Sequence, residues 1–354
     1  MSIINIYDVY GFLKTAKFKQ NLYPIESSGF PVGGIHYLLR HLISDLMERE
    51  SVVCCFDGQG SEKSFGRVEG YKANRKKDAW VLVQADFLFD FLRQCGIPCY
   101  RGYGEADDHI FSFIEANKSL LNKGIKMRIH ASDWDLVHNV DERGVSYYTC
   151  NSNTSNVCYS NYSEEVGLCD EPIMFNTVTA YKVFCGDRSD NVGTFTSENG
   201  IKGIDLYRGY KNALNATGTY ISGAVSRSRE LLEHFVSRIN LTENDLIKLN
   251  KRMDTFFPRN LISKVGEYKY VYKEEVDLLK LFKYCLALRD FNCVKIIKNN
   301  YKFSVADDDE DISDYKAKLY DLGLEYKNGT YQSDRNIKFN QNERFGEIFD
   351  AKGV

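Results

Sequence analysis

Three apolar runs of strand length each end at an aspartate, and this recurrence constrains the fold more than any other feature of the chain. The runs are SIINIYD (2–8), ESVVCCFDG (50–58) and KGIKMRIHASDWDL (123–136). Residues 33–50 and 78–97 between them have helical periodicity. Strands that alternate with helices of this length predict an α/β fold with a mostly parallel sheet, whose ligands bind outside the carboxyl ends of the strands. The aspartates expected at these ends are Asp8, Asp57, Asp133 and Asp135.

Two further segments add acidic residues. In YGEADDHIFSFI, Glu105, Asp107 and Asp108 stand directly before an apolar stretch that predicts a helix. On this segment alone two interpretations stay open: the acids cap the start of the helix, or they belong to a metal site. Adjacent carboxylates repel one another where burial lowers the dielectric, so a nearby cation is expected. In FCGDRSDNV, Asp187 and Asp190 are three residues apart and would be neighbours on a helical turn.

Together these positions make nine carboxylates at expected strand ends or helix starts. The set is Asp8, Asp57, Glu105, Asp107, Asp108, Asp133, Asp135, Asp187 and Asp190. Such a set cannot stay ionised without multivalent cations, and ligation by oxygen alone favours a hard ion such as Mg²⁺ or Mn²⁺ over zinc. Two ions about 4 Å apart are a standard arrangement for cleaving a phosphodiester. The sequence therefore predicts a two-ion site for phosphoryl chemistry.

A basic segment supplies groups that would bind phosphate. SFGRVEGYKANRKK, residues 64–77, contains one acid, Glu69. Its cations are Arg67, Lys72, Arg75, Lys76 and Lys77. The alternative interpretation is a solvated basic helix face, since charge runs are common on helices. Tyr71 favours the nucleic-acid interpretation, because an aromatic ring among cations can stack on an unpaired base.

The net charge of -3 argues against a polyanionic partner until it is divided along the chain. Residues 302–354 hold 8 basic and 12 acidic residues, which leaves 38 basic and 37 acidic residues in 1–301. With nine acids assigned to metal ions, 28 acids face 38 basic residues, a net charge of +10. That excess is sufficient for binding nucleic acid through phosphate contacts and counterion release.

Other features exclude whole classes of protein. The N-terminus lacks a basic stretch followed by a long apolar run, and no later run approaches the roughly 20 apolar residues of a membrane span. We expect a cytoplasmic protein (in the host cytoplasm if the chain is viral) without a membrane partner. Ten scattered cysteines fit a reducing compartment better than structural zinc. The acidic run VADDDEDISD predicts a solvated linker, and RFGEIFD near the end offers a short apolar face for a partner or for the protein's own surface.

Five motifs taken in order resemble the 5′-nuclease family of flap endonucleases and 5′→3′ exonucleases, and most closely its bacteriophage members. The motifs are FDG, YKANRK, GEADD, SDWDL and GDRSDN. The resemblance covers residues from about 3 to 300. It implies a PIN-like α/β core with flanking helices and a helical DNA-binding region. The implied divisions are a core at 1–190 with a helical arch at about 59–95, a helical region at 191–301 with a helix–hairpin–helix loop at about 199–212, and a linker and tail at 302–354.

The resemblance also implies roles for individual residues. The first ion would draw on Glu105, Asp107, Asp108 and Asp133, and the second on Asp135, Asp187 and Asp190. Lys72 and Arg75 would neutralise the scissile phosphate and so join Asp133 and Asp135 as catalytic residues. In the arch, Tyr71 would stack on a base, with Arg67, Lys76 and Lys77 also binding DNA. Lys182, in AYKVFCGD, matches a further basic position of the phage enzymes.

GIKGIDLYRGY resembles the hairpin loop that binds duplex phosphates through backbone amides, often with a K⁺ ion. The DNA-binding residues implied here are Gly200, Lys202, Gly203, Arg208 and Lys211. The chain departs from the family pattern at Asp205, where a third glycine is usual, and at Tyr207, where a lysine is common. Arg208 and Lys211 are expected to compensate.

The function implied is hydrolysis of the 5′ strand of branched or nicked DNA and of RNA primers, by a monomer that acts in DNA replication or repair. Replication proteins would be recruited through the C-terminal tail. Two alternatives stay open: a ribonuclease of the broader PIN class, and a catalytically inactive protein that binds DNA junctions. The arch and hairpin segments favour the flap nuclease, because a minimal PIN domain has neither.

Overall fold

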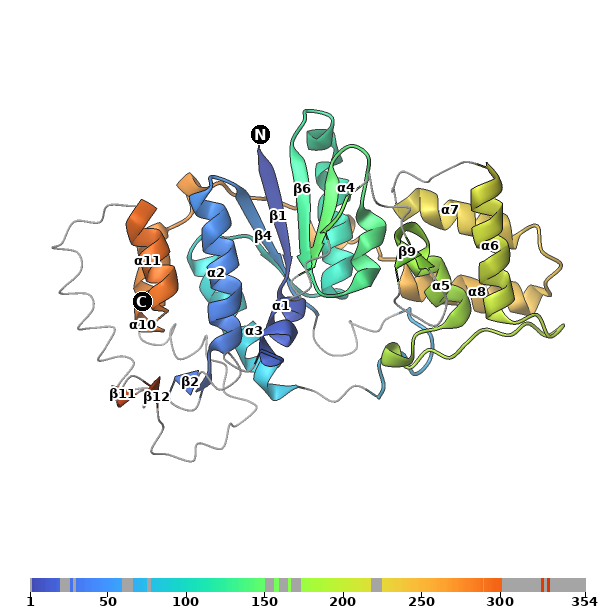
Figure 1. The fold of residues 1–354 in the computed structure, drawn as a ribbon, viewed down its shortest axis with the longest axis horizontal. Helices are drawn as coiled ribbons and strands as arrows, with labels where there is room; N and C mark the ends of the chain where they lie inside the picture. Colours follow the sequence, from blue (N-terminus) through green and yellow to red (C-terminus); the bar gives the residue numbers. More distant parts are fainter. Residues whose placement is uncertain are drawn as a thin grey trace. The chain divides into compact units, whose positions relative to one another are not determined.

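The chain forms two compact units. The computed structural model describes residues 2–19, 26–27, 30–58, 66–74, 78–149, 156–158, 165–166, 173–217, 225–288, 290–300, 326–327 and 330–331. The β1 unit comprises Ser2–Phe56, Lys77–Tyr100 and Lys269–Val354, and the α4 unit comprises Asp57–Lys76 and Arg101–Tyr268. Figure 1 shows both units and labels many of their helices and strands.

Parallel strands and the helices around them build the β1 unit. Its elements are β1 (Ile3–Asp8), α1 (Val9–Lys17), β2 (Glu26–Ser27), β3 (Phe30–Pro31), α2 (Gly33–Met47), β4 (Ser51–Cys55), α3 (Ala79–Gln94), β5 (Cys99–Tyr100), the 3₁₀ turn η6 (Lys273–Glu275), α10 (Leu278–Ala287), α11 (Phe291–Asn300), β11 (Tyr326–Lys327) and β12 (Thr330–Tyr331). β4 pairs in parallel with β1 on one side, where Asp8 lies opposite Cys55, and with β5 on the other. Both β1 and β4 are almost wholly buried, which explains why they are continuous apolar runs rather than alternating ones. The α11 helix packs against α2, beside which it lies in Figure 1.

The α4 unit combines strands with a group of helices. Its elements are α4 (Ala106–Leu121), β6 (Lys126–Ala131), the 3₁₀ helix η2 (Trp134–Asn139), β7 (Val145–Thr149), β8 (Asn156–Val157), β9 (Glu165–Val166), β10 (Ile173–Met174), η4 (Phe175–Thr177), α5 (Val178–Cys185), η5 (Arg188–Asp190), α6 (Gly203–Thr217), α7 (Val225–Val236), α8 (Glu243–Phe256) and α9 (Ile262–Val265). β6 pairs with β7 in parallel and β7 with β8 antiparallel. The α4 helix packs on β6, so the start of α4 and the end of β6 belong to one compact body.

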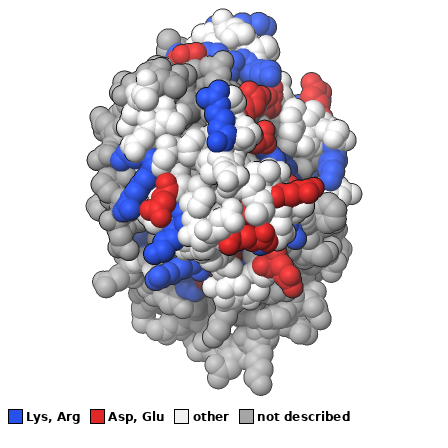
Figure 2. All heavy atoms as spheres, turned by 90° about the vertical axis from the view of Figure 1, so that its right-hand side faces the viewer, with Lys and Arg blue, Asp and Glu red and all other residues white. Residues whose placement is uncertain are grey.

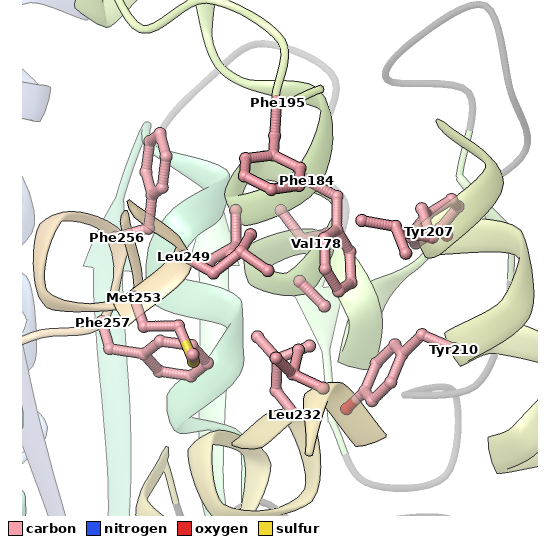
Figure 3. Packing of buried hydrophobic residues seen from close by; sticks show 14 of the residues in the cluster. Val178, Phe184, Phe195, Tyr207, Tyr210, Leu232, Leu249, Met253, Phe256 and Phe257 are labelled. Carbon is pink, nitrogen blue, oxygen red and sulfur yellow. The ribbon is translucent and has the colours of Figure 1, made fainter. Parts of the chain in front are cut away.

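Aromatic and aliphatic side chains from α5, α6, α7 and α8 form the core of the helical part of the α4 unit. Phe184, Leu249 and Met253 are fully buried, and Figure 3 shows these side chains converging from different helices. Leu249 and Met253 are four residues apart on α8, so one face of that helix enters the core. At the start of α6, a Cβ on Gly203 would lie 2.1 Å from the Phe184 carbonyl oxygen, and only glycine permits this approach.

The α/β class with a mostly parallel sheet is confirmed by the parallel pairs β1–β4, β4–β5 and β6–β7. The helical pattern expected beyond residue 190 is confirmed by α6, α7, α8, α10 and α11. The predicted division at 190 stays a prediction, although neither compact unit ends there.

The predicted helical arch differs from the structure at its YKAN segment. Tyr71–Asn74 form turns, not a helix. Gly70 and Lys72 have φ values of 76° and 55°, which a right-handed helix does not allow. The α3 helix does lie within the range predicted for the arch. Among the helices that the structure describes, none is both long and apolar enough to cross a membrane.

Candidate active site

Turns that directly follow β6 and α5 position two of the predicted acids, Asp133 and Asp187. After β6, Asp133 caps η2 by accepting a hydrogen bond from the Asp135 backbone N–H at 3.0 Å. After α5, Asp187 caps η5 by accepting one from the Ser189 N–H at 2.8 Å. Gly186 makes this second turn possible, because its φ is 80° and a Cβ there would lie 2.3 Å from the Val192 carbonyl oxygen.

Three carboxylates meet at these turns. Asp135, Asp187 and Asp190 each offer an oxygen within 4.8 Å of the others. The Lys182 ammonium on α5 lies between two of them, 2.5 Å from Asp135 Oδ1 and 2.6 Å from Asp187 Oδ2. The cluster thus concentrates negative charge around one half-buried cation.

Burial and ion pairing act in opposite directions on these groups. Burial, with the nearby Asp133 charge, raises the pKa of Asp135 to about 7 despite the opposing effect of Lys182. Burial would also raise the pKa of Asp187, but Lys182 and hydrogen bonds from Ser189 lower it to about 2. Burial disfavours the charged form of Lys182, yet the surrounding carboxylates hold its pKa well above the usual value. The ammonium is therefore the charge that balances the cluster.

The donor set fits a hard divalent ion. Asp135, Asp187 and Asp190 supply carboxylate oxygens alone, the ligands preferred by Mg²⁺ and Mn²⁺. These are the three residues assigned to the second ion by the family resemblance. The structure brings them together, and their role as ligands stays a prediction.

A second group of acids lies at the start of α4. Glu105 Oε1 is 2.6 Å from the Lys72 ammonium, and Oε2 accepts a hydrogen bond from the Tyr71 hydroxyl at 2.8 Å. Asp57 accepts a hydrogen bond from the Ala106 N–H at 3.0 Å, which places the FDG motif beside the same helix start. Burial and the neighbouring acids Asp108 and Glu105 raise the pKa of Asp107 well above its usual value.

Asp108 has a structural role at this helix start. From the third position of α4, its Oδ2 accepts a hydrogen bond from the N–H of the N-cap residue Glu105 at 3.0 Å, as in a capping box. The same carboxylate pairs with Arg67 Nη2 at 3.1 Å and Arg259 Nη2 at 2.9 Å. The cap interpretation of GEADD thus fits Glu105 and Asp108 together, and the predicted metal-binding role of these residues stays a prediction.

Lys72 links the two groups of acids. Its ammonium is 2.6 Å from Glu105 and 4.0 Å from Asp190, and its backbone N–H donates to the Asp190 carbonyl oxygen at 2.7 Å. The carboxylates hold the pKa of Lys72 above its usual value although burial opposes this. The Tyr71 ring lies 4.8 Å from the Lys72 ammonium and 5.2 Å from the Arg67 guanidinium. The segment predicted to bind phosphate thus reaches the acids.

The remaining predicted core residues are placed differently. Asp8 lies in the β1 unit, at the carboxyl end of β1, where it caps α1 by accepting from the Gly11 N–H at 3.1 Å. Arg75, Lys76 and Lys77 lie outside the described residues. Their predicted roles stay predictions.

The hairpin predicted to bind duplex DNA has its glycine amides engaged. The Gly200 N–H donates to the Ser197 carbonyl oxygen and the Gly203 N–H to that of Phe195, both at 2.9 Å. Both N–H groups thus already donate within the protein, and neither is free to donate to a phosphate as the prediction requires. The side chains of Lys202 and Arg208 are exposed and that of Lys211 is half-buried.

The two departures from the family pattern in this loop have structural explanations. Tyr207 is buried and its hydroxyl lies 3.0 Å from the Thr177 hydroxyl, so it belongs to the core. Asp205 lies 3.7 Å from Arg208, within ion-pair distance. On the face seen in Figure 2, several Lys and Arg side chains lie along the left side, and most Asp and Glu side chains lie towards the centre and right.

Two residues at the site were not singled out from the sequence. Arg259, in FPRNL, pairs with Asp108, and a lone arginine gives no pattern that predicts this contact. Asn191 has a φ of 59°, and its side-chain amide donates to the Gly70 carbonyl oxygen at 2.9 Å. The second could have been found, because asparagine is enriched in the left-handed region and ends the GDRSDN motif.

The comparisons with known proteins agree with the site's chemistry. A family model described as the 5′-3′ exonuclease N-terminal resolvase-like domain matches residues 6–167. Over these residues the chain is similar to the 5′-3′ exonuclease family, as the motifs predicted. A search of curated proteins found no match.

Solved structures of three nucleases are also similar to the chain. The bacteriophage T5 5′-exonuclease with bound zinc is 16% identical over 84% of this chain and 98% of its own, with a TM-score of 0.42. The Rad2 catalytic core with DNA substrate is 11% identical over 84% of this chain and 92% of its own, with a TM-score of 0.44. Human GEN1 with Holliday junction DNA is 12% identical over 95% of this chain and 78% of its own, with a TM-score of 0.41. The similarity to the 5′-3′ exonuclease family is that of residues 6–167.

Proposed function

We propose that the protein is a structure-specific 5′ nuclease that hydrolyses phosphodiesters at 5′ flaps and nicks in DNA, and in RNA primers. The observation that carries the proposal is the meeting of Asp135, Asp187 and Asp190 with two lysines, Lys182 and Lys72. Clustered carboxylates next to cations can bind a divalent ion and a phosphate at one place. The match of residues 6–167 to the 5′-3′ exonuclease family supports this reading of the site.

The ions that this chemistry needs are Mg²⁺, with Mn²⁺ as a substitute. Asp135, Asp187 and Asp190 would hold one ion, and Glu105 with Asp107 would contribute to a second. Bound divalent ions activate water and neutralise the charge that develops on the leaving oxygen. In the hydrolysis, an oxygen from water bonds to phosphorus and the bond to the 3′ oxygen breaks, which leaves a 5′-phosphate and a 3′-hydroxyl.

The protein's own residues position the phosphate. Lys72 and Lys182 place two ammonium groups beside the carboxylates. A scissile phosphate at the cluster would replace its hydrogen bonds from water with hydrogen bonds from these two groups. Tyr71 donates its hydroxyl hydrogen to Glu105, which fixes the ring beside Lys72. In this way the turn at Tyr71 and Lys72 sets the place of the substrate relative to the acids.

The proposal extends to the setting in which the enzyme works. Phage-type sequence motifs support a role in DNA replication or repair, as a monomer in the cytoplasm, or in the host cytoplasm if the chain is viral. The RFGEIFD segment supports recruitment by replication proteins. A K⁺ ion at the 199–212 loop would assist binding of the duplex, for which the exposed Lys202 and Arg208 offer charge.

The test is cleavage of three labelled substrates: a 5′-flap DNA, the same flap in RNA, and a linear duplex. We expect Mg²⁺-dependent incision near the flap junction, abolished by EDTA and by Asp133→Asn. Lys123→Met, at an exposed position after α4, is the control and should cleave normally. Cleavage of the RNA flap alone would support the PIN-class ribonuclease instead. Salt-dependent binding without any cleavage would support the inactive junction-binding protein.

A further inference from the structure

We propose that Asp108 is the anchor of a two-arginine clamp, formed with Arg67 and Arg259, and is not a metal ligand. The clamp holds the turn that carries Tyr71 and Lys72 against Glu105. The inference rests on the proposed function, because it assigns positioning residues to that site. It departs from the family resemblance, which implies Asp108 as a ligand of the first ion.

The first argument is the occupancy of the Asp108 carboxylate. Its Oδ1 accepts a hydrogen bond from the Arg259 backbone N–H at 2.7 Å. Its Oδ2 accepts from the Glu105 N–H at 3.0 Å, from Arg67 Nη2 at 3.1 Å and from Arg259 Nη2 at 2.9 Å. Three of these donors share Oδ2 and one uses Oδ1, so both oxygens of the carboxylate are engaged within the protein. The side chain is fully buried, so no exposed edge is left for an ion.

The second argument is charge. Two guanidinium groups already balance the single charge of Asp108, at 3.1 Å and 2.9 Å from its Oδ2. Asp107 differs, because within the described part of the chain it accepts one hydrogen bond, from the Asp108 N–H at 3.1 Å, and has no ion pair. Of the two neighbouring aspartates, Asp107 is therefore the one with oxygens available to a divalent ion.

Arg67 and the residue after it attach the 66–74 segment to two helices. Arg67 also lies 3.3 Å from Glu105 Oε2, and its Nη1 donates to the Thr255 carbonyl oxygen at the end of α8. The next residue repeats the attachment, because the Val68 N–H donates to Thr255 Oγ1 at 2.9 Å. The segment at 66–74 is thus fixed at its start to α8 and to the start of α4.

The fixed segment holds a strained residue that the site needs. Lys72 has a φ of 55°, a conformation that is unfavourable for a non-glycine residue and persists only where its surroundings determine it. The clamp on one side and the Lys72 N–H bond to Asp190 on the other determine it here. Loss of the clamp should therefore release the Lys72 ammonium from Glu105 without removing any ion ligand.

The test compares Asp108→Asn, Arg259→Gln and Asp107→Asn in the full chain. Mn²⁺ affinity is measured by electron paramagnetic resonance, hydrogen exchange is followed for residues 66–74, and single-turnover rates are measured on flap DNA. Arg259 is 26% exposed as a side chain, so its variant keeps the test open if the buried Asp108 variant fails to fold. Arg259→Lys retains the positive charge but lacks the planar guanidinium with its paired N–H donors, and it serves as the conservative variant.

The clamp predicts that Asp108→Asn and Arg259→Gln leave Mn²⁺ affinity within about twofold of wild type, raise exchange at 66–74 and slow cleavage roughly 10- to 100-fold. Asp107→Asn should instead weaken Mn²⁺ binding at least tenfold and leave exchange at 66–74 unchanged. Weakened Mn²⁺ binding in Asp108→Asn, with normal exchange, would overturn the inference. The binding and exchange results decide this even if the wild-type protein proves not to cleave flaps, which would overturn only the proposed function.

Discussion

Replacement of Lys182 by methionine tests how the acidic cluster is balanced. Lys182 lies within 2.6 Å of both Asp135 and Asp187, and its side chain is only 18% exposed. Removing one partner of a buried ion pair leaves the other charge uncompensated and costs about 3–5 kcal/mol. We expect the metal-free variant to lose about that much unfolding free energy, which lowers the melting temperature by roughly 6–20 °C for a unit of this size.

Divalent ions should reverse most of this loss. An ion that binds only the folded protein stabilises it by about 2.7 kcal/mol at a concentration 100 times its Kd. In the wild type the ion competes with the Lys182 ammonium for the same oxygens, and in Lys182→Met it does not. The melting temperature of the variant should therefore rise more with Mg²⁺ than that of the wild type.

Differential scanning fluorimetry over a Mg²⁺ titration measures both effects. Lys123→Met, which removes an exposed lysine of the same unit, is the control and should follow the wild type. If Lys182→Met melted at the wild-type temperature in EDTA, or gained no more from Mg²⁺ than the wild type, the charge balance described for the cluster would be refuted.

Three further predictions concern the fold around the site. Burial lowers the pKa of His138 to about 3, so the folded protein binds fewer protons than the unfolded chain below about pH 6.5. The stability that this histidine contributes is complete above pH 6.5 and is lost as the pH falls towards 3. In urea unfolding, the free energy of unfolding of His138→Asn should therefore decline less steeply over that pH range than that of the wild type. Leu249→Ala should cost about 2–5 kcal/mol in the same assay, whereas Ile247→Ala, on α8 but 59% exposed, should change stability by less than about 0.5 kcal/mol; equal losses would contradict the packing in Figure 3. Gly203→Ala should give a thermally destabilised protein, because its Cβ would lie 2.1 Å from the Phe184 carbonyl oxygen, and a normal melting curve would show that α6 does not start there.

Much of the fold could be predicted because its signals are local. Each apolar run that ends in aspartate became a strand, and Asp133 and Asp187 lie at turns because each accepts a hydrogen bond from the backbone two residues later. The prediction that Asp187 and Asp190 are neighbours needed only their spacing. Their meeting with Asp135 was implied by the family resemblance alone, because Asp187 and Asp190 follow the α5 helix and not a strand.

The contacts that could not be predicted join segments far apart in the chain. Arg67 reaches Thr255 across 188 residues and Arg259 reaches Asp108 across 151, and neither arginine stands in a pattern that names its partner. The same holds for the turn at Lys72, whose positive φ is maintained by a bond to Asp190. Helical periodicity could not reveal it, because an isolated lysine carries no signal for the left-handed region.

The hairpin shows a third limit of sequence reasoning. Glycines at Gly200 and Gly203 match a phosphate-binding loop, yet glycine also serves close packing. In the structure Gly203 is required by the nearness of the Phe184 carbonyl, and its N–H bonds within the protein. Spacing alone cannot distinguish an amide that faces a ligand from one that closes a turn.

The most direct test of the central claim is the single-turnover cleavage of a 5′-flap DNA across a Mg²⁺ titration, by the wild type and by Asp187→Asn, with the product ends identified. The account predicts incision near the junction that requires Mg²⁺, yields 5′-phosphate and 3′-hydroxyl ends, and falls at least 100-fold in the variant. Cleavage that continues in EDTA, or that Asp187→Asn leaves at the wild-type rate and Mg²⁺ dependence, would contradict it.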